Sequence, residues 1–468
     1  MINGITIFVP FLTKQQKGSE RVRSTSVHLL YYLLSIIFYL RQPWLLCVLL
    51  IAVIPIFPEY ICPLLAAGAL IAAHFDAKAR RRDLVVGGIG KLLLIYIAYM
   101  AVTIIFSDNP FNSVSTVLMW IAAFAAYVSL ATVLSNRHRF DTALFCITLI
   151  AGVVGFIACM QYVLRAWFDV NVSMYFWQWI DLAIYRYFPM PLLLDLHELR
   201  AASTFNNPNV MAEYLIMVIP FASYYAFSGL RKSTRLLCRF CLLFALFGVA
   251  FSFSRGSYLA LLVIVAVFCM ANIRKWSIIL LGGVSILALI PSSVLDRLMS
   301  VGSMDNSISE RFRIWTVSFG EIARNPLFGS GPGIQNFWDV LMTNGISAPH
   351  THNLVLQLLI EGGLIALVLM MLIGWRTFRN GFQMLKCPQE GRMLGVAFIG
   401  FVGAFIMYGM VDFPFLCPKL VTSFMMVMGI SDCASRVYLD QRVQALTSLV
   451  PSGTDARTAV SAAFFKTK

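Results

Sequence analysis

Long apolar segments that recur along the whole chain are the feature that most constrains its fold. A membrane-spanning helix needs about 20 predominantly apolar residues, and segments of this kind alternate here with short polar stretches. The chain of 468 residues is 59% hydrophobic and 12% charged, whereas about a quarter of a typical soluble domain is charged. The sequence therefore predicts an all-α, polytopic integral membrane protein with a single membrane domain over residues 1–468.

The length of the apolar segments predicts about twelve transmembrane helices. Residues 28–40 are apolar but short, so they either lie in the membrane interface or extend the first helix, and the role of residues 1–42 stays open. The predicted spans are 43–57, 60–74, 86–106, 114–134, 142–165, 209–229, 238–253, 257–272, 276–291, 353–373, 394–411 and 418–434.

Basic residues gather in alternate loops, which predicts the orientation of the chain. Lys and Arg accumulate in cytoplasmic loops, so the net charge of +14 reflects membrane topology and not a nucleic-acid partner. Both termini, including a tail at 437–468, are then cytoplasmic. The basic stretches that fall on this side are 77–83, 135–141, 231–239, 272–276 and 375–386.

The opposite, outer face receives two long loops, at 166–208 and at 292–352 between the ninth and tenth spans. Loops longer than about 15 residues are uncommon in compact domains and are usually functional. We therefore expect the loop at 292–352 to carry part of an active site.

The cysteines and the N-terminus give no sign of a metal site or of processing. The ten cysteines lie mostly in apolar runs, and none forms a C-x-x-C pair with histidine partners, so we predict neither bound metal nor disulfides. No small-residue cleavage site follows a short apolar core, so we expect no cleaved signal peptide.

A glycine-rich stretch and a pair of polar residues in the tenth span are interpreted as parts of the structure and not of an active site. The sequence GSGPG at 329–333 matches no nucleotide-binding spacing and is interpreted as a turn. Gln357 and Glu361 lie one helical turn apart in the tenth span, which is typical of hydrogen bonding between neighbouring membrane helices.

A histidine pair stands where the tenth span begins, in the sequence SAPHTHNLV. A helix N-terminus disfavours positive charge by about 0.3–1 kcal/mol, and nearby arginines act in the same direction. His352 should therefore be neutral at pH 7 and able to accept a proton, unless it only caps the helix at the membrane interface. His350 and Asn353 are secondary candidates.

Arginines occupy the outer ends of several spans. Arg255 lies in a short turn between two spans, where it either snorkels to lipid headgroups or presents a fixed guanidinium. Arg311 lies on the polar side of an amphipathic segment, and Arg313 beside it is a secondary candidate.

Carboxylates and amides accompany these arginines. Arg200 and Asn209 precede the sixth span, Glu213 lies in its first turn, and Asp412 follows the eleventh span. A carboxylate at the mouth of a helix bundle is a functional candidate, and an arginine is its expected partner.

Five of these residues come from separate stretches that the predicted topology sends to the outer face. Arginine binds phosphate through a two-pronged fork, and a neutral base beside a bound phosphate suits transfer from a phosphate-bearing donor to a hydroxyl. No ATP is present outside the cytoplasm, so a lipid diphosphate that carries a sugar chain fits best. The five residues are Arg200, Arg255, Arg311, His352 and Asp412.

The chain resembles the O-antigen ligase and polymerase superfamily of bacterial membrane glycosyltransferases, and most of all the O-antigen ligases. The resemblance covers residues 200–415 and departs at Ala366, where the family usually has Gly, Thr or Tyr. The stretches that carry it are STFNNPNVMAEYL, SFSRGSYLAL, ERFRIWTVSFGEIARNPLFGSGPGIQNFW and HTHNLVLQLLIEGGL.

The resemblance implies a multi-pass protein of the bacterial inner membrane that needs no cofactor. Such enzymes take a glycan from undecaprenyl diphosphate on the periplasmic side, and the ligases pass it to a sugar hydroxyl of lipid A-core. Arg255, Arg311 and His352 correspond to essential residues of the family. We expect His352 to deprotonate the acceptor, these arginines and Arg200 to hold the diphosphate, and Asp412 to orient His352 or an arginine.

Alternative functions remain open. A polymerase that extends a lipid-linked glycan and a protein O-oligosaccharyltransferase would use the same site. A transporter of anions or lipid-linked glycans should show midplane charges and broken helices in paired halves, whereas the ionisable residues here gather at one mouth. A purely structural subunit would leave these polar motifs without a purpose.

Overall fold

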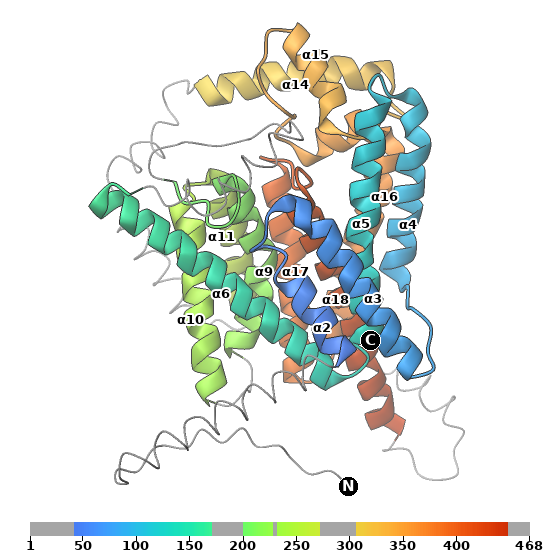
Figure 1. The fold of residues 1–468 in the computed structure, drawn as a ribbon, viewed down its shortest axis with the longest axis vertical. Helices are drawn as coiled ribbons and strands as arrows, with labels where there is room; N and C mark the ends of the chain where they lie inside the picture. Colours follow the sequence, from blue (N-terminus) through green and yellow to red (C-terminus); the bar gives the residue numbers. More distant parts are fainter. Residues whose placement is uncertain (1–41, 171–199, 228–231, 272–305, 448–468) are drawn as a thin grey trace, which may run out of the picture.

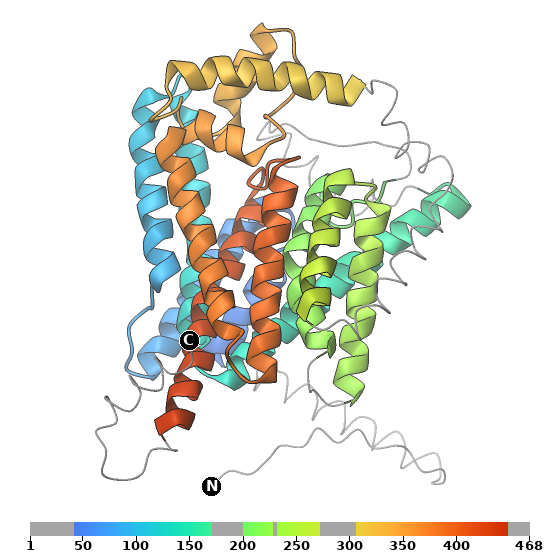
Figure 2. The ribbon, with the colours of Figure 1, turned by 180° about the vertical axis from the view of Figure 1, so that it is seen from behind.

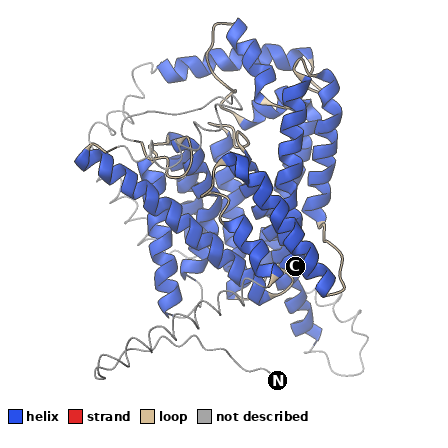
Figure 3. Ribbon diagram, in the orientation of Figure 1, coloured by secondary structure: helices blue, strands red, loops and turns tan. Residues whose placement is uncertain are grey.

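The computed structural model describes residues 42–170, 200–227, 232–271 and 306–447, and within them it contains helices and no strand (Figures 1 and 3). The α-helices are α2 (Pro43–Ala52), α3 (Cys62–Ala79), α4 (Gly88–Thr103), α5 (Pro110–Val133), α6 (Arg137–Phe168), α9 (Pro208–Phe227), α10 (Lys232–Phe251), α11 (Arg255–Ala271), α14 (Asn306–Arg324), α15 (Ile334–Thr343), α16 (Leu354–Met384), α17 (Gln389–Gly409) and α18 (Pro418–Thr447). Two short 3₁₀ helices, Glu59–Ile61 and Ile104–Phe106, precede α3 and follow α4.

Nine helices in the described part of the chain are long and apolar enough to cross a membrane, which confirms the all-α, polytopic class. The remaining apolar helices, α2 and α11, are shorter. The predicted span at 276–291 and the ambiguous segment at 28–40 lie outside the described residues.

Several predicted boundaries differ from the structure. The span predicted at 43–57 is wrong, because α2 ends at Ala52 and a helix of 10 residues reaches only about 15 Å. α2 and α3 instead pack together as a short hairpin. The tail predicted at 437–468 begins inside α18, which continues to Thr447. The loops predicted at 166–208 and 292–352 are described only in part, and the second one contains α14 and α15.

α9 lies at the centre of the bundle, with nearly all of its residues buried against α6, α10, α11, α17 and α18. Small residues allow the closest approaches, as is common where helices pack inside a membrane. A Cβ at Gly155 of α6 would stand 2.2 Å from the carbonyl oxygen of Phe244 in α10.

One end of the bundle contains the basic stretches 77–83 and 135–141, which the sequence places on the same side; the predicted basic stretch 272–276 lies outside the described residues. Arg80, after α3, donates to Ser135 Oγ at 3.5 Å. Arg137, which begins α6, forms an ion pair with Glu390 of α17. These contacts join loops that are distant in sequence at a single end of the molecule.

α14 and α15 lie across the opposite end of the bundle (Figures 1 and 2). The turn between them fits into a break in α16, where Gly363 adopts φ 63° and ψ −163°. Ser330 N donates to Ile360 O at 2.7 Å, and Leu364 N donates to Pro326 O at 2.9 Å. The predicted glycine-rich turn is thus the joint that fixes this layer to the membrane-spanning helices.

Candidate functional site

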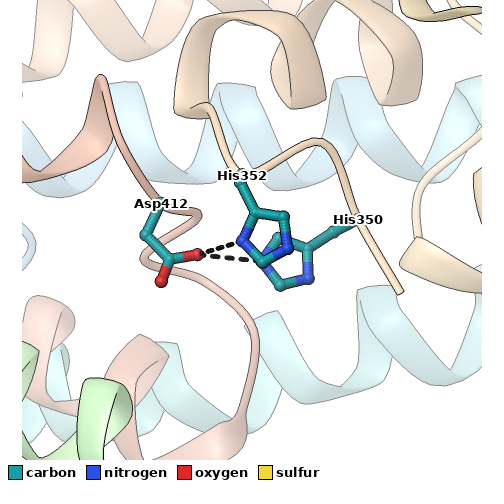
Figure 4. A group of neighbouring side chains, drawn as sticks. All are labelled: His350, His352 and Asp412. Atoms are coloured by element: carbon teal, nitrogen blue, oxygen red, sulfur yellow. Dashed lines mark hydrogen bonds and ion pairs between the residues drawn. The ribbon is translucent and has the colours of Figure 1, made fainter. Parts of the chain in front are cut away.

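His350 and His352 contact the same carboxylate oxygen. His350 Nε2 lies 2.9 Å and His352 Nδ1 3.2 Å from Asp412 Oδ1 (Figure 4). The His350 side chain is 4% exposed, whereas that of His352 is 26% exposed. The two rings lie close together, with centroids 4.2 Å apart. Of the two imidazoles, His352 is therefore the one that solvent or a substrate can reach.

Asn353 fixes the loop that carries the histidines. Its side-chain oxygen caps α16 by accepting from Val355 N at 2.9 Å and Leu356 N at 3.1 Å. Its amide nitrogen donates to Met410 O at 3.1 Å, which ties the loop to the end of α17 just before Asp412. His352 has φ 50°, a left-handed conformation that is uncommon for a residue other than glycine and that clusters at functional sites.

The electrostatics of the trio favour an ionised carboxylate beside a neutral His350. Burial alone would raise the pKa of Asp412, but hydrogen bonds from His350 and His352 lower that pKa below its ordinary value of 3.8. Burial lowers the pKa of His350 below 6.5, against the hydrogen bond to Asp412, which raises it. Arg311 also lowers the pKa of His350.

These protonation states assign the tautomers through the hydrogen-bond network. An ionised carboxylate only accepts hydrogen bonds, so both nitrogens that face Asp412 Oδ1 carry protons. In the neutral form of His352 with Nδ1 protonated, the lone pair is on Nε2, and that nitrogen is the one that can accept a proton.

A cavity of about 230 Å³ is lined by three arginines, whereas His350 and His352 are not among its lining residues. Arg200 precedes α9, Arg255 begins α11, and Arg311 lies on α14. A wall of the cavity also includes Asp412, which places the guanidinium groups and the histidine-bound carboxylate around one space. The other polar lining residues are Asn209, Ser254 and Tyr408.

Local contacts hold two of these arginines in place. Arg200 Nε donates to Ser252 O at 2.8 Å, and its Nη2 donates to Asn209 Oδ1. α14, which carries Arg311, is fixed one turn later because Trp315 Nε1 donates to Thr351 O at 3.1 Å in the histidine loop. The loop between α10 and α11 also contains a left-handed residue, Phe253 with φ 49°, directly at the cavity.

Two residues that the sequence singles out do not line the cavity. Arg313 is exposed and does not line the cavity. Glu213 is buried in α9, makes no ion pair with any described residue, and its Oε1 has no hydrogen-bond partner among them. Asp412 is bonded to the two histidines, and among the described residues it forms no ion pair with an arginine, the partner that the sequence suggests.

Tyr408 belongs to the site but is missed by sequence reasoning. Its hydroxyl lies 3.2 Å from Asn209 O and 3.5 Å from Asp412 Oδ2, so it bridges the start of α9 and the carboxylate. The sequence signal that could have indicated Tyr408 is its spacing, because this residue precedes Asp412 by one helical turn.

The trio could also accommodate a metal ion. His350, His352 and Asp412 each place one ligand atom within 4.8 Å of the others. Histidine and carboxylate are ordinary ligands of zinc, and hydrogen bonding within the trio accounts for the same geometry. The absence of a metal requirement remains a prediction.

The fold and the site together define a polytopic membrane protein with an arginine-lined cavity, bordered by a histidine-bound carboxylate, at one end of a helix bundle. Residues 240–371 match the O-antigen ligase family, a stretch that includes Arg255, Arg311 and both histidines but neither Arg200 nor Asp412.

One curated relative is the exopolysaccharide production protein ExoQ of Rhizobium meliloti (strain 1021), which is 25% identical over 187 residues. The match covers 37% of this chain and 41% of the relative, so it spans less than half of either protein. Together with the family match, it confirms the resemblance to the O-antigen ligase superfamily.

Proposed function

We propose that the protein transfers a glycan from a lipid diphosphate to a hydroxyl acceptor at the arginine-lined cavity. The observation that carries this proposal is the meeting of Arg200, Arg255 and Arg311, from three separate segments, around one cavity. The same cavity is bordered by Asp412, which is bonded to both histidines.

The arginines bind the diphosphate of the donor and stabilise the charge that develops as it departs. Guanidinium groups fit phosphate oxygens in pairs, and donors fixed in advance stabilise a leaving group at little reorganisation cost. The backbone and side-chain contacts of Arg200 provide such fixation.

His352 acts as the general base. Its Nε2 takes the proton of the acceptor hydroxyl while the hydroxyl oxygen bonds to the anomeric carbon, and the bond from that carbon to the phosphate oxygen breaks. Attack from the face opposite the diphosphate inverts the anomeric configuration. Asp412 holds the Nδ1 proton and stabilises the imidazolium that forms.

The superfamily resemblance supports the identity of the substrates. The donor is an O-antigen glycan on undecaprenyl diphosphate, and the acceptor is a sugar hydroxyl of lipid A-core. The reaction takes place at the periplasmic face of the bacterial inner membrane, with both termini in the cytoplasm, because the cavity lies at the end opposite the basic loops.

A polymerase is the second candidate. The name of the relative ExoQ refers to exopolysaccharide production, which favours an acceptor that is itself a growing glycan. The described site suits both reactions, since the two differ only in the molecule that brings the hydroxyl. A protein acceptor would use the same chemistry.

Purified protein in liposomes with undecaprenyl-diphosphate-linked glycan tests these alternatives. Separate samples receive lipid A-core, a pilin-like protein or no second acceptor, and glycan products are resolved by gel and mass spectrometry. A ligase glycosylates lipid A-core, whereas a polymerase lengthens the donor glycan without any addition. Movement of the donor across the bilayer without a glycan product would instead establish a transporter and contradict the proposal.

His352→Ala should abolish most of the transfer in this assay. General-base assistance contributes about 10²–10⁴-fold, so the variant should lose activity on that scale while it inserts normally. Insertion is checked by size-exclusion chromatography in detergent. Full transfer by a correctly inserted His352→Ala protein would rule out the assigned base.

A further inference from the structure

Gln357 and Glu361 are buried polar side chains of α16 that have no part in the chemistry above. Gln357 is 0% and Glu361 4% exposed. Buried polar groups are costly unless they are hydrogen-bonded, so the partners of this pair indicate its purpose.

Gln357 reaches back to the loop that carries both histidines. Its Oε1 accepts from Thr351 N at 3.1 Å, and its Nε2 donates to Glu361 Oε1 at 2.9 Å. Thr351 is the residue between His350 and His352, so Gln357 holds the peptide bond that joins His350 to Thr351. Both bonds of Gln357 run within α16 or to this loop, so this residue does not make the bond to a neighbouring helix that the sequence suggests.

The remaining polar groups of Thr351 are fixed as well. Its carbonyl accepts from Trp315 Nε1 at 3.1 Å, and its hydroxyl donates to Asn353 O at 2.7 Å. With Gln357 on the amide, every hydrogen-bonding group of Thr351 is engaged. The next residue, His352, is therefore held in its left-handed conformation by its neighbours and not by its own preference.

We call the contact of Gln357 with Thr351 and Glu361 the clamp. Glu361 connects this clamp to the layer of α14 and α15. It accepts a hydrogen bond from the backbone amide of Gly333, at the start of α15. The preceding residue, Ile360, accepts from Ser330 N in the same turn. The helix that carries Arg311 and the loop that carries His352 are thus anchored to one turn of α16.

We propose that Gln357, oriented by Glu361, is a positioning residue that fixes the Thr351 peptide and thereby the imidazole of His352. The inference rests on the proposed function for its catalytic meaning, but its geometric claim stands separately. Loss of the clamp lets His352 leave the conformation in which Asp412 holds its Nδ1 and Nε2 is available.

Exchange of the two side chains tests the clamp. Gln357→Glu alone places two carboxylates one turn apart in a buried site and removes the donor to Glu361. The double variant Gln357→Glu/Glu361→Gln restores the pattern, because the carboxylate at 357 accepts from Thr351 N and from the new amide at 361. That amide still accepts from Gly333.

The single variant Gln357→Glu should lower kcat, and the double variant should restore it. Misplacement of a reacting group by about 1 Å costs about 10²-fold, so Gln357→Leu and Gln357→Glu should lower kcat at least tenfold, with the KM for the donor nearly unchanged. The double variant should recover most of the loss. A double variant no more active than Gln357→Glu, or a Gln357→Leu protein with wild-type kcat, would overturn the proposal.

A chemical probe separates this inference from the proposed function. Diethyl pyrocarbonate modifies unprotonated imidazole, and mass spectrometry gives the modification rate of His352 relative to the exposed His74. Gln357→Leu and Gln357→Glu should alter this ratio, and the double variant should restore it. An unchanged ratio in correctly inserted single variants contradicts the clamp, whether or not the wild-type protein transfers glycan. If Gln357→Leu does not insert, the exchange variants decide alone.

Discussion

Oδ1 of Asp412 contacts both imidazoles, and the two histidines have different roles in the proposed mechanism. His350 is buried and bonded to Asp412 at 2.9 Å, so it stabilises the carboxylate from the protein side. His352 is more exposed, and in the proposed mechanism its Nε2 takes the proton of the acceptor. We therefore expect His352 to take the proton and His350 to keep the carboxylate in place.

Arg311 and Arg313 form a matched pair for testing the phosphate site. Arg311 lines the cavity, whereas Arg313, two residues later on α14, is exposed and does not. A hydrogen bond to a charged group contributes about 1.5–3 kcal/mol, so Arg311→Lys should slow transfer about 10- to 100-fold, because an ammonium cannot bind two oxygens as a fork. Arg313→Lys should transfer at the wild-type rate. Equal effects of the two substitutions in the liposome assay would contradict the assignment.

The pKa of His350 predicts a pH dependence of stability. The unfolded chain protonates this histidine below its ordinary pKa of 6.5, whereas the folded protein, with a lowered pKa, leaves it neutral. The unfolded state then binds more protons, so stability should fall as the pH decreases below about 6.5. Asp412 contributes stability that is present above 3.8 and lost only as the pH falls further, through its lowered folded pKa.

His350→Gln isolates this effect, because an amide can donate to Asp412 but does not titrate. Melting temperatures in detergent between about pH 7.5 and 5.5 should decline less steeply for His350→Gln than for the wild type. Parallel curves for the two proteins would show that His350 is protonated in the folded state as readily as in the unfolded one.

At the scale of elements, α16 connects the histidine loop, the clamp and the turn between α14 and α15. Its first residues follow the histidine loop, its second turn carries the Gln357 and Glu361 clamp, and its break at Gly363 receives the turn between α14 and α15. A Cβ at Gly363 would stand 2.3 Å from the backbone of Leu327, so the break and the turn require each other.

Gly363→Ala should therefore destabilise the protein and reduce transfer. An L side chain at this backbone conformation costs about 1–3 kcal/mol, to which the steric conflict with Leu327 adds. Gly374→Ala, in the same helix with no atom within 4 Å of the added Cβ, should be neutral or stabilising by up to about 1 kcal/mol. Thermal unfolding monitored in detergent checks both, and a harmless Gly363→Ala would show that the turn can leave the break.

At the scale of the whole molecule, the bundle separates a basic end from an end that carries the cavity and the α14–α15 layer. This polarity was predictable from the sequence, because apolar spans and alternating basic loops follow directly from the physics of the bilayer. The short α2 was predicted as a full span over 43–57, a range that contains Pro55, although proline interrupts a helix.

The candidate site could be predicted less completely. The residue types and their common face follow from loop positions, which placed Arg255, Arg311 and His352 together. The hydrogen-bond partners of these residues could not be predicted from loop positions. The bond between His350 and Asp412 depends on packing between segments that are distant in sequence. The bond between Gln357 and Thr351 depends on the path of the loop.

Cysteine labelling tests the orientation of the two ends. Thr343 in α15 and Arg82 after α3 are both exposed, at the cavity end and at the basic end. A membrane-impermeant maleimide applied to intact spheroplasts should label Thr343→Cys and spare Arg82→Cys, with the wild type reporting the background from its native cysteines. The reverse pattern would place the cavity in the cytoplasm.

The most direct test of the central claim is an electron cryomicroscopy structure of the protein with undecaprenyl diphosphate. The account predicts density for the diphosphate among Arg200, Arg255 and Arg311, on the cavity side of Asp412. Diphosphate density at another place on the molecule, with this cavity empty at saturating ligand, would contradict it.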